Sequence, residues 1–123
     1  IWIPAARPDV VRADNVAGLR TRLVLQGANI PFTAEAEGAL HARGVIVVPD
    51  FVANAGGVIC AAMEYAGASR AVAFDAIAER VGSNTATVLG NARAGGQMPR
   101  RAAEALAQSR VREAMKHRRF SIL

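Results

Sequence analysis

Three short apolar runs, each followed by a loop of small residues, constrain the fold of this chain more than any other feature. The runs occupy residues 1–3, 23–25 and 45–48, and helical sequence separates them. An apolar run of this length between helices is typical of a strand in a parallel sheet that is covered on both faces. Connections this long favour parallel neighbours. The sequence therefore predicts an α/β fold that contains half of a doubly wound parallel sheet.

Small and amide-bearing residues follow the three predicted strands. Ala5 follows the first strand, Gly27 and Asn29 follow the second, and Asn54 follows the third. Ligands of open parallel sheets bind beyond the carboxyl ends of the strands, where small residues leave the backbone accessible. An asparagine amide can bind a carboxamide, a ribose hydroxyl or a carboxylate without adding charge. A second interpretation stays open, in which Asn29 is a turn residue and Asn54 is the N-cap of a helix that begins at Ala55.

Helical signals lie between the strands and after them. Asp14-Asn15 precedes a short helix within residues 8–19, while Thr33 and Gly44 are the expected N-cap and stop of a longer one. We divide the chain into residues 1–66, a partial nucleotide-binding half, and residues 67–123, helices that pack on it or on a domain outside this chain.

The later helices are expected to have apolar faces. The helix after Asn54 has one such face, a second helix runs from about residue 69 to 91, and a third begins near Pro99. The predicted inner positions of the first and third helices are Val58, Ala61, Ala62 and Tyr65, and Ala103, Leu106, Ala107, Val111, Ala114 and Met115.

Length and composition match one globular domain. A chain of 123 residues with 52% hydrophobic and 20% charged residues can bury roughly 65 to 70% of its unfolded surface. No apolar run approaches the roughly 20 residues that a membrane span requires. The single cysteine, Cys60, cannot form an intramolecular disulfide, and we expect it to be a buried, inert thiol. These features predict a cytoplasmic protein with no membrane partner.

Positive charge gathers at the C-terminal end. From Arg93 onward there are eight basic and two acidic residues, whereas the whole chain has a net charge of +5. A basic tail is one signature of a nucleic-acid surface, but the last helix offers no aromatic residue for base stacking. We interpret the arginines as a solvated helix face and expect no nucleic-acid partner, with a basic nucleic-acid-binding module as the weaker alternative.

Few residues of this chain are candidates for catalysis. His41 and His117 lie on predicted helices without an acid or nucleophile at a spacing that implies a site, so we predict no catalytic residue and no metal site. Asp50 is the one carboxylate near the predicted ligand edge, and we interpret it as a loop or capping residue. Two glycines in the first turn of a helix, Gly56-Gly57, indicate that a ligand or backbone approaches closely, because each costs about 1 kcal/mol relative to alanine.

Four motifs in order resemble the C-terminal part of the glutamate/leucine/phenylalanine/valine dehydrogenases. The motifs are Ile3-Pro4-Ala5-Ala6, Gly27-Ala28-Asn29 with Pro31, Pro49-Asp50, and Ala53-Asn54-Ala55-Gly56-Gly57-Val58. The resemblance covers most of the chain, and four motifs at suitable spacing are more specific than any single one. It implies the second half of a Rossmann-type parallel sheet followed by C-terminal helices.

The resemblance also implies an activity and a set of site residues. Enzymes of this family interconvert an amino acid such as glutamate and its 2-oxo acid plus ammonia, with NAD or NADP as the hydride carrier. Asn29 matches a family asparagine at the ribose and nicotinamide end of the cofactor, and Asn54 matches the asparagine beside the nicotinamide and the substrate. The expected cofactor-binding residues are thus Asn29, Asn54, Ala5 and Gly27, and the expected substrate-binding residues are Val58 and Ala61.

Departures from the family pattern limit what this chain can do alone. Ile30 stands where the family commonly has glycine, and Ala61 stands where glutamate-specific members often carry serine. The family's catalytic lysine and aspartate and its glycine fingerprint fall upstream of residue 1. We therefore expect an inactive fragment that needs an amino-acid substrate and the N-terminal part of the same enzyme, the whole being a homo-oligomer. The alternative is a noncatalytic nucleotide-binding or interaction domain derived from such an enzyme.

Overall fold

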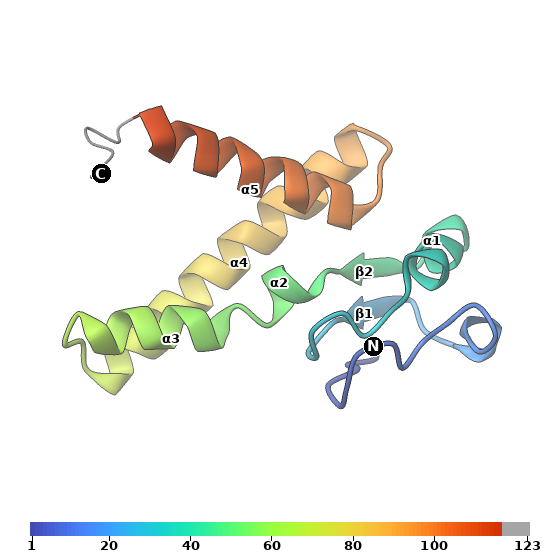
Figure 1. Ribbon diagram of the computed structural model, residues 1–123, viewed down its shortest axis with the longest axis horizontal. Helices are drawn as coiled ribbons and strands as arrows, with labels where there is room; N and C mark the ends of the chain where they lie inside the picture. Colours follow the sequence, from blue (N-terminus) through green and yellow to red (C-terminus); the bar gives the residue numbers. More distant parts are fainter. Residues whose placement is uncertain (117–123) are drawn as a thin grey trace, which may run out of the picture.

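The computed structural model describes residues 1–116, and the expectations for His117 and the residues after it lie outside that range. Two short strands and a series of helices follow one another along the chain (Figure 1). The elements are η1 (Val16–Gly18), β1 (Leu23–Leu25), α1 (Ala34–Ala42), β2 (Ile46–Val48), α2 (Asp50–Ala53), α3 (Gly56–Tyr65), α4 (Arg70–Ala94) and α5 (Pro99–Lys116).

The sheet is parallel, as the sequence predicts. β1 pairs with β2, and Val24 lies opposite Val47 in the register. Of the predicted first strand, only an isolated bridge from Trp2 to Val24 forms, also in the parallel sense. Its backbone hydrogen bonds run from the Trp2 nitrogen to the Leu23 oxygen and from the Leu25 nitrogen to the Trp2 oxygen, at 2.9 and 3.1 Å. Trp2 therefore extends the sheet beyond β1, over a shorter length than residues 1–3.

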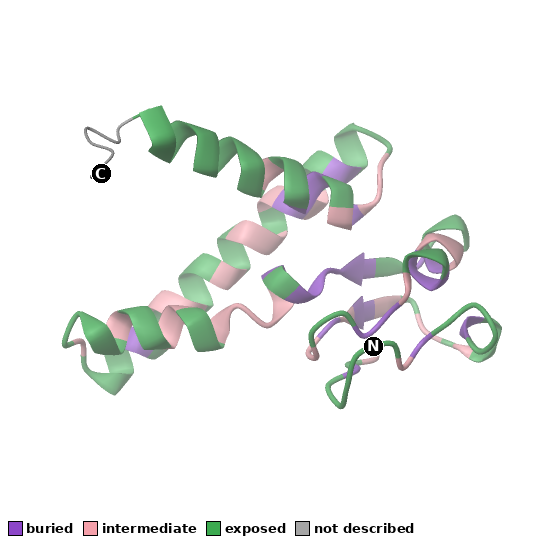
Figure 2. Ribbon diagram, viewed as in Figure 1, coloured by how far each residue is buried: buried purple, intermediate pink, exposed green. Residues whose placement is uncertain are grey.

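Apolar side chains cover both faces of the sheet, because successive strand residues point to opposite sides. One core lies between the sheet and α1 and is made of Val11, Val16, Val24, Phe32, Ala36, Leu40, Val45 and Val47. The other lies between the sheet and the crossing of α4 with α5 and is made of Val48, Val52, Val88, Ala92, Ala102 and Ala103. Figure 2 shows the buried residues gathered in these regions.

Local signals explain most helix boundaries. The Thr33 side chain accepts a hydrogen bond from the Ala36 nitrogen at the start of α1, and Gly44 with φ +74° follows its end. Ser69 caps α4 in the same way through the nitrogen of Val72. Pro99 is the first residue of α5, where its missing N–H costs nothing.

Two predictions about where helices begin were wrong. The region 8–19 forms only the 3-10 turn η1, and the Asn15 side chain makes no cap bond to it. Asn15 instead accepts from the Arg12 nitrogen and donates to the Val10 oxygen, which closes the preceding loop. Asn54 does not cap α3: it ends α2, and Ala55 is the N-cap of α3 without a side-chain bond.

The predicted inner faces of α3 and α5 are largely exposed. Val58 and Tyr65 are 77% and 97% exposed, while Ala103 is buried but Val111 and Met115 are 58% and 60% exposed. α3 packs against α4 at a distance from the sheet, as Figure 1 shows. The exposed part of these faces, at Val58, Tyr65, Val111 and Met115, is not covered by residues 1–116.

Cys60 is half-buried on α3 rather than buried, and its Sγ lies 3.8 Å from a carboxylate oxygen of Glu64. No helix among residues 1–116 combines the length and the hydropathy that crossing a membrane requires.

Candidate functional site

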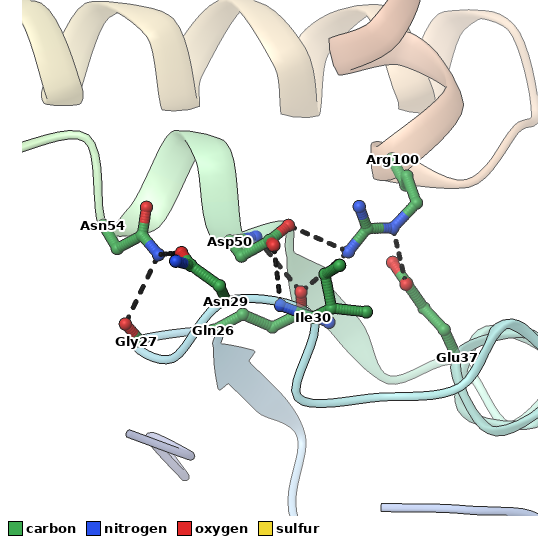
Figure 3. Close-up of polar contacts among 8 residues, drawn as sticks. All are labelled: Gln26, Gly27, Asn29, Ile30, Glu37, Asp50, Asn54 and Arg100. Atoms are coloured by element: carbon green, nitrogen blue, oxygen red, sulfur yellow. Dashed lines mark hydrogen bonds and ion pairs between the residues drawn. The ribbon is translucent and has the colours of Figure 1, made fainter. Parts of the chain in front are cut away.

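The structure brings Asn29 and Asn54 together beyond the carboxyl ends of β1 and β2. The Asn54 Nδ2 donates to Asn29 Oδ1 at 2.8 Å and to the backbone oxygen of Gly27 at 3.4 Å. Figure 3 shows the two amides facing each other across the gap between their loops. The sequence placed both residues at one sheet edge, and the direct bond between them is new information from the fold.

Ala5 and Gly27 also meet at this edge. A Cβ added to Gly27 would lie 3.1 Å from the Cβ of Ala5 and 3.5 Å from the backbone oxygen of Pro4. The nitrogens of Gly27 and Ala28 both donate to that same oxygen, at 3.0 and 2.8 Å. Gly27 is therefore needed for close contact between two loops of this chain.

Ile30 has an unusual backbone conformation next to Asn29. Its φ is +47°, in the left-handed region that β-branched residues rarely adopt. The Ile30 nitrogen donates to Asp50 Oδ2 at 2.8 Å, and its backbone oxygen accepts from the Asp9 nitrogen at 2.9 Å. Both backbone polar groups of Ile30 are thus satisfied.

Asp50 belongs to a buried polar cluster that sequence reasoning missed. Arg100 of α5 donates from Nε to Glu37 Oε2 at 2.7 Å and from Nη2 to Asp50 Oδ1 at 3.1 Å. Gln26 Oε1 accepts from Arg100 Nη2 at 2.8 Å and from the Asp50 nitrogen at 3.1 Å. Glu37 and Gln26 are 3% and 0% exposed. One guanidinium of α5 therefore joins α1, α2 and the residue that follows β1 (Figure 3).

Charge and burial oppose each other at this cluster. Burial acts to raise the pKa of Asp50, but the N–H of Ile30 and the charge of Arg100 outweigh it, so the pKa lies below its ordinary value. For Arg100, burial acts to lower the pKa, and the carboxylates of Glu37 and Asp50 outweigh that effect and raise it. Both groups are charged at neutral pH.

The interpretation of the C-terminal arginines as a solvated face was wrong for Arg100. Its position one residue after Pro99, in the first turn of α5, gave no sign of a buried partner. Arg110 also has a polar partner, since its Nη1 donates to Asn84 Oδ1 at 2.9 Å. The sequence carries no local signal for this contact, because the burial of Glu37 and Asp50 exists only in the folded chain.

The two expected substrate residues occupy one exposed side of α3. Val58 lines a hollow of about 370 Å³ with Ala55 and Ile59 of the α3 region and Glu79, Arg80, Ser83, Asn84 and Arg110 of α4 and α5. Ala61 lies one turn further along α3 and is exposed outside that lining.

The two glycines at the start of α3 have different surroundings. A Cβ on Gly56 would lie 3.3 Å from the Cγ2 of Ile77, so this glycine lets α3 pack closely on α4. A Cβ on Gly57 would meet nothing within 4 Å, which leaves that side of the first turn open. No cluster of metal-ligating side chains occurs among the described residues.

A family model confirms the resemblance that the motifs indicate. The model for glutamate/leucine/phenylalanine/valine dehydrogenase matches residues 1–119. The NADP(+)-dependent glutamate dehydrogenase of Pyrobaculum calidifontis is 57% identical over 65 residues, which are 53% of this chain and 15% of that enzyme. The NAD-specific glutamate dehydrogenase A of Halobacterium salinarum is 42% identical over 65 residues, again 53% of this chain and 15% of that enzyme.

Solved structures share the fold over nearly the whole chain. The hetero-hexameric glutamate dehydrogenase of Thermus thermophilus superposes with a TM-score of 0.82 at 27% identity, covering 98% of this chain and 30% of that one. The L-tryptophan dehydrogenase of Nostoc punctiforme has a TM-score of 0.83 at 22% identity and covers 93% of this chain and 35% of that one. The fold is therefore the α/β, Rossmann-type arrangement that the sequence predicts, and this chain spans only a minor part of each relative.

Proposed function

The chain belongs to the glutamate/leucine/phenylalanine/valine dehydrogenase family, and on that basis we propose that it is the C-terminal cofactor-binding portion of an NAD- or NADP-dependent amino-acid dehydrogenase. The whole enzyme would oxidatively deaminate an L-amino acid such as glutamate to its 2-oxo acid. The observation that carries this proposal is the 2.8 Å contact between Asn29 and Asn54 at the carboxyl edge of a parallel sheet.

The amide pair has the donors and acceptors that a nicotinamide nucleotide needs. Asn54 uses its NH2 group within the pair, so its own carbonyl oxygen and the NH2 group of Asn29 have no partner within residues 1–116. One acceptor and one donor side by side match a carboxamide or a ribose hydroxyl. The bound dinucleotide supplies hydride transfer, and these side chains orient it.

The remaining expected residues have supporting roles in this proposal. Ala5 and Gly27, in close contact, form a loop surface without bulky side chains beside the amide pair. Val58 and Ala61 contribute apolar surface where the substrate side chain would lie. The hollow beside Val58 is lined by two basic residues, Arg80 and Arg110, and one acidic residue, Glu79. An amino acid or 2-oxo acid carries a carboxylate, which such a neighbourhood favours.

We further propose that this chain alone does not turn over substrate. The carboxylate near the Asn29–Asn54 edge, that of Asp50, is already held by Arg100 and by the N–H of Ile30. The N-terminal part of the enzyme would therefore supply the group that moves a proton at the reacting carbon. The proposed partners are the amino-acid substrate, that N-terminal part, and further copies of the subunit in a cytoplasmic homo-oligomer. The alternative, a noncatalytic nucleotide-binding domain, would keep the amide pair but would have neither the amino-acid substrate nor the N-terminal catalytic part.

Mapping of dinucleotide binding on the isotopically labelled chain tests the proposal. Titration with NADH and NADPH should shift the backbone signals of Gly27 and Asn29 and both side-chain amides of the pair. Asn54→Ala should lower the affinity by about 5- to 30-fold, since a hydrogen bond to a polar ligand group contributes roughly 1 to 2 kcal/mol.

Asn91, an exposed asparagine of α4, supplies the matched control, and Asn91→Ala should bind as the wild type does. Absence of saturable shifts at millimolar dinucleotide, or shifts confined to other parts of the chain, would contradict the proposed function.

A further inference from the structure

We propose that Arg100 is a positioning residue for the Asn29–Asn54 pair and acts on it through Asp50. Arg100 contacts neither asparagine, but its guanidinium holds the carboxylate that both loops share (Figure 3). Any effect of Arg100 on cofactor binding rests on the proposed function. Its effect on the distance between the two asparagines can be tested in the ligand-free chain.

Asp50 is hydrogen-bonded to Asn54 and to the residue that follows Asn29. Its Oδ2 accepts from the nitrogen of Ile30, the residue that follows Asn29, at 2.8 Å. Its backbone oxygen accepts from the nitrogen of Asn54, the residue that ends α2, at 2.8 Å. A rotation of the Asp50 side chain would therefore break the connection on the Asn29 side and leave the connection on the Asn54 side intact. The relative position of the two amides depends on the orientation of this carboxylate.

Ile30 needs such a restraint. A left-handed φ of +47° brings the branched side chain against its own backbone, and the side chain is 60% exposed, so packing does little to hold it. On the opposite side, Ile30 is held by the bond from Asp9 to its backbone oxygen and by the next residue, Pro31, which is fully buried. Strained conformations persist only where their surroundings over-determine them. Release from Asp50 should let Ile30 relax and carry Asn29 away from Asn54.

Arg100 determines the orientation of the Asp50 carboxylate. Its Nη2 bonds Asp50 Oδ1 and Gln26 Oε1, and its Nε bonds Glu37 Oε2. The ring of Phe51 lies 5.7 Å from the guanidinium carbon and covers it. The planar fork presents these donors in fixed directions, which the ammonium of a lysine cannot reproduce. A helix that is remote in sequence thus controls the geometry at the sheet edge.

Nuclear magnetic resonance of the ligand-free chain tests this role. In Arg100→Lys, which keeps the positive charge, the Asn54 side-chain amide signals should move toward those of an exposed asparagine. Hydrogen exchange at the Ile30 amide should accelerate about tenfold or more, because the strained residue loses the hydrogen bond that restrains it. Arg101→Lys, at the exposed neighbouring position, is the matched control and should change neither signal.

A second substitution separates positioning from general stability. Glycine adopts a positive φ without strain, so in the Ile30→Gly background the pair should stay together when Arg100 is replaced. The shift of the Asn54 amide caused by Arg100→Lys should then fall to a small fraction of its size in the Ile30 background. A purely structural contribution of Arg100 would produce equal shifts in both backgrounds and would overturn the proposal.

Asp50→Asn tests the same connection at Asp50, the residue between Arg100 and Ile30. This variant can be used if Arg100→Lys does not fold. It should release the Ile30 amide and shift the Asn54 signals in the same direction. Unchanged Asn54 signals in a folded Arg100→Lys or Asp50→Asn protein would also overturn the positioning role.

Titration with NADH separates this inference from the proposed function. Arg100→Lys should weaken NADH binding and Ile30→Gly should restore it. If NADH does not bind the wild-type chain, the proposed function fails, and the ligand-free spectra still decide whether Arg100 positions the pair.

Discussion

At the residue scale, close contact between loops determines which small residues can be replaced. Gly27 lies against Ala5 and the backbone of Pro4, and its neighbours leave no ordinary space for a methyl group. Gly38, inside α1, has nothing within 4 Å of the position of an added Cβ. The same substitution therefore has opposite consequences at these two positions.

Gly27→Ala should lower the free energy of unfolding by about 1 to 3 kcal/mol, because the new methyl group forces the two loops apart. Gly38→Ala should raise it by about 0.5 to 1 kcal/mol, because alanine loses less backbone entropy in a helix. Urea unfolding of both variants and the wild type measures the two changes. Equal shifts of the same sign would show that the loop contact at Gly27 is unimportant.

At the element scale, the two halves of the chain differ in how their helices are held. α1 buries Ala36 and Leu40 against the sheet, whereas α3 contains no buried residue and packs mainly on α4. Helices in proteins owe most of their stability to packing of one face. α3 is therefore the less stable helix, although it carries the expected substrate residues.

Hydrogen exchange should show this difference directly. The amides of α3 should exchange through local opening at a lower free energy than those of β1, β2 and α1, because little apolar surface is exposed when α3 opens. Exchange followed residue by residue on the isolated chain measures both groups in one sample. Equal protection of α3 and α1 would show that α3 opens only with the whole fold.

The sequence predicted the strands and helices better than the contacts between residues that are distant in the chain. β1, β2 and α1 were predicted because an apolar run, a threonine cap and a stopping glycine are local signals. The site was predicted in part: the sequence placed Asn29 and Asn54 at one edge, but assigned Asn54 as a possible cap of α3. Arg100 was missed because its partners, Glu37 and Asp50, are 63 and 50 positions away.

At the scale of the whole molecule, several large apolar side chains of the described part face solvent. Val58, Tyr65, Val111 and Met115 are between 58% and 97% exposed. The matched 65 residues cover 15% of the curated glutamate dehydrogenases cited above, and nearly the whole chain covers 30% of the Thermus thermophilus enzyme. We therefore propose that further parts of the protein cover these faces. The division of the chain at residues 66 and 67 stays a prediction.

The isolated chain should self-associate through these faces, since exposed apolar patches favour contact between copies. Sedimentation velocity should show a weight-average mass that rises with concentration, together with a concentration-dependent melting temperature. Tyr65→Lys with Met115→Lys should reduce the association, while Arg101→Lys should not. A monomer at all concentrations would contradict this prediction.

The sequence by itself determined β1 and β2, their parallel arrangement, the capped helix α1 and the edge where the amides lie. These features depend on residues that are neighbours in the chain or on rules that hold for every parallel sheet. Only the tertiary structure decided that Asn54 bonds Asn29, that Ile30 is held in a left-handed conformation, and that Arg100 bonds the carboxylate of Asp50. Such contacts join residues that are distant in sequence, and their energies depend on burial and orientation, which exist only once the elements have packed.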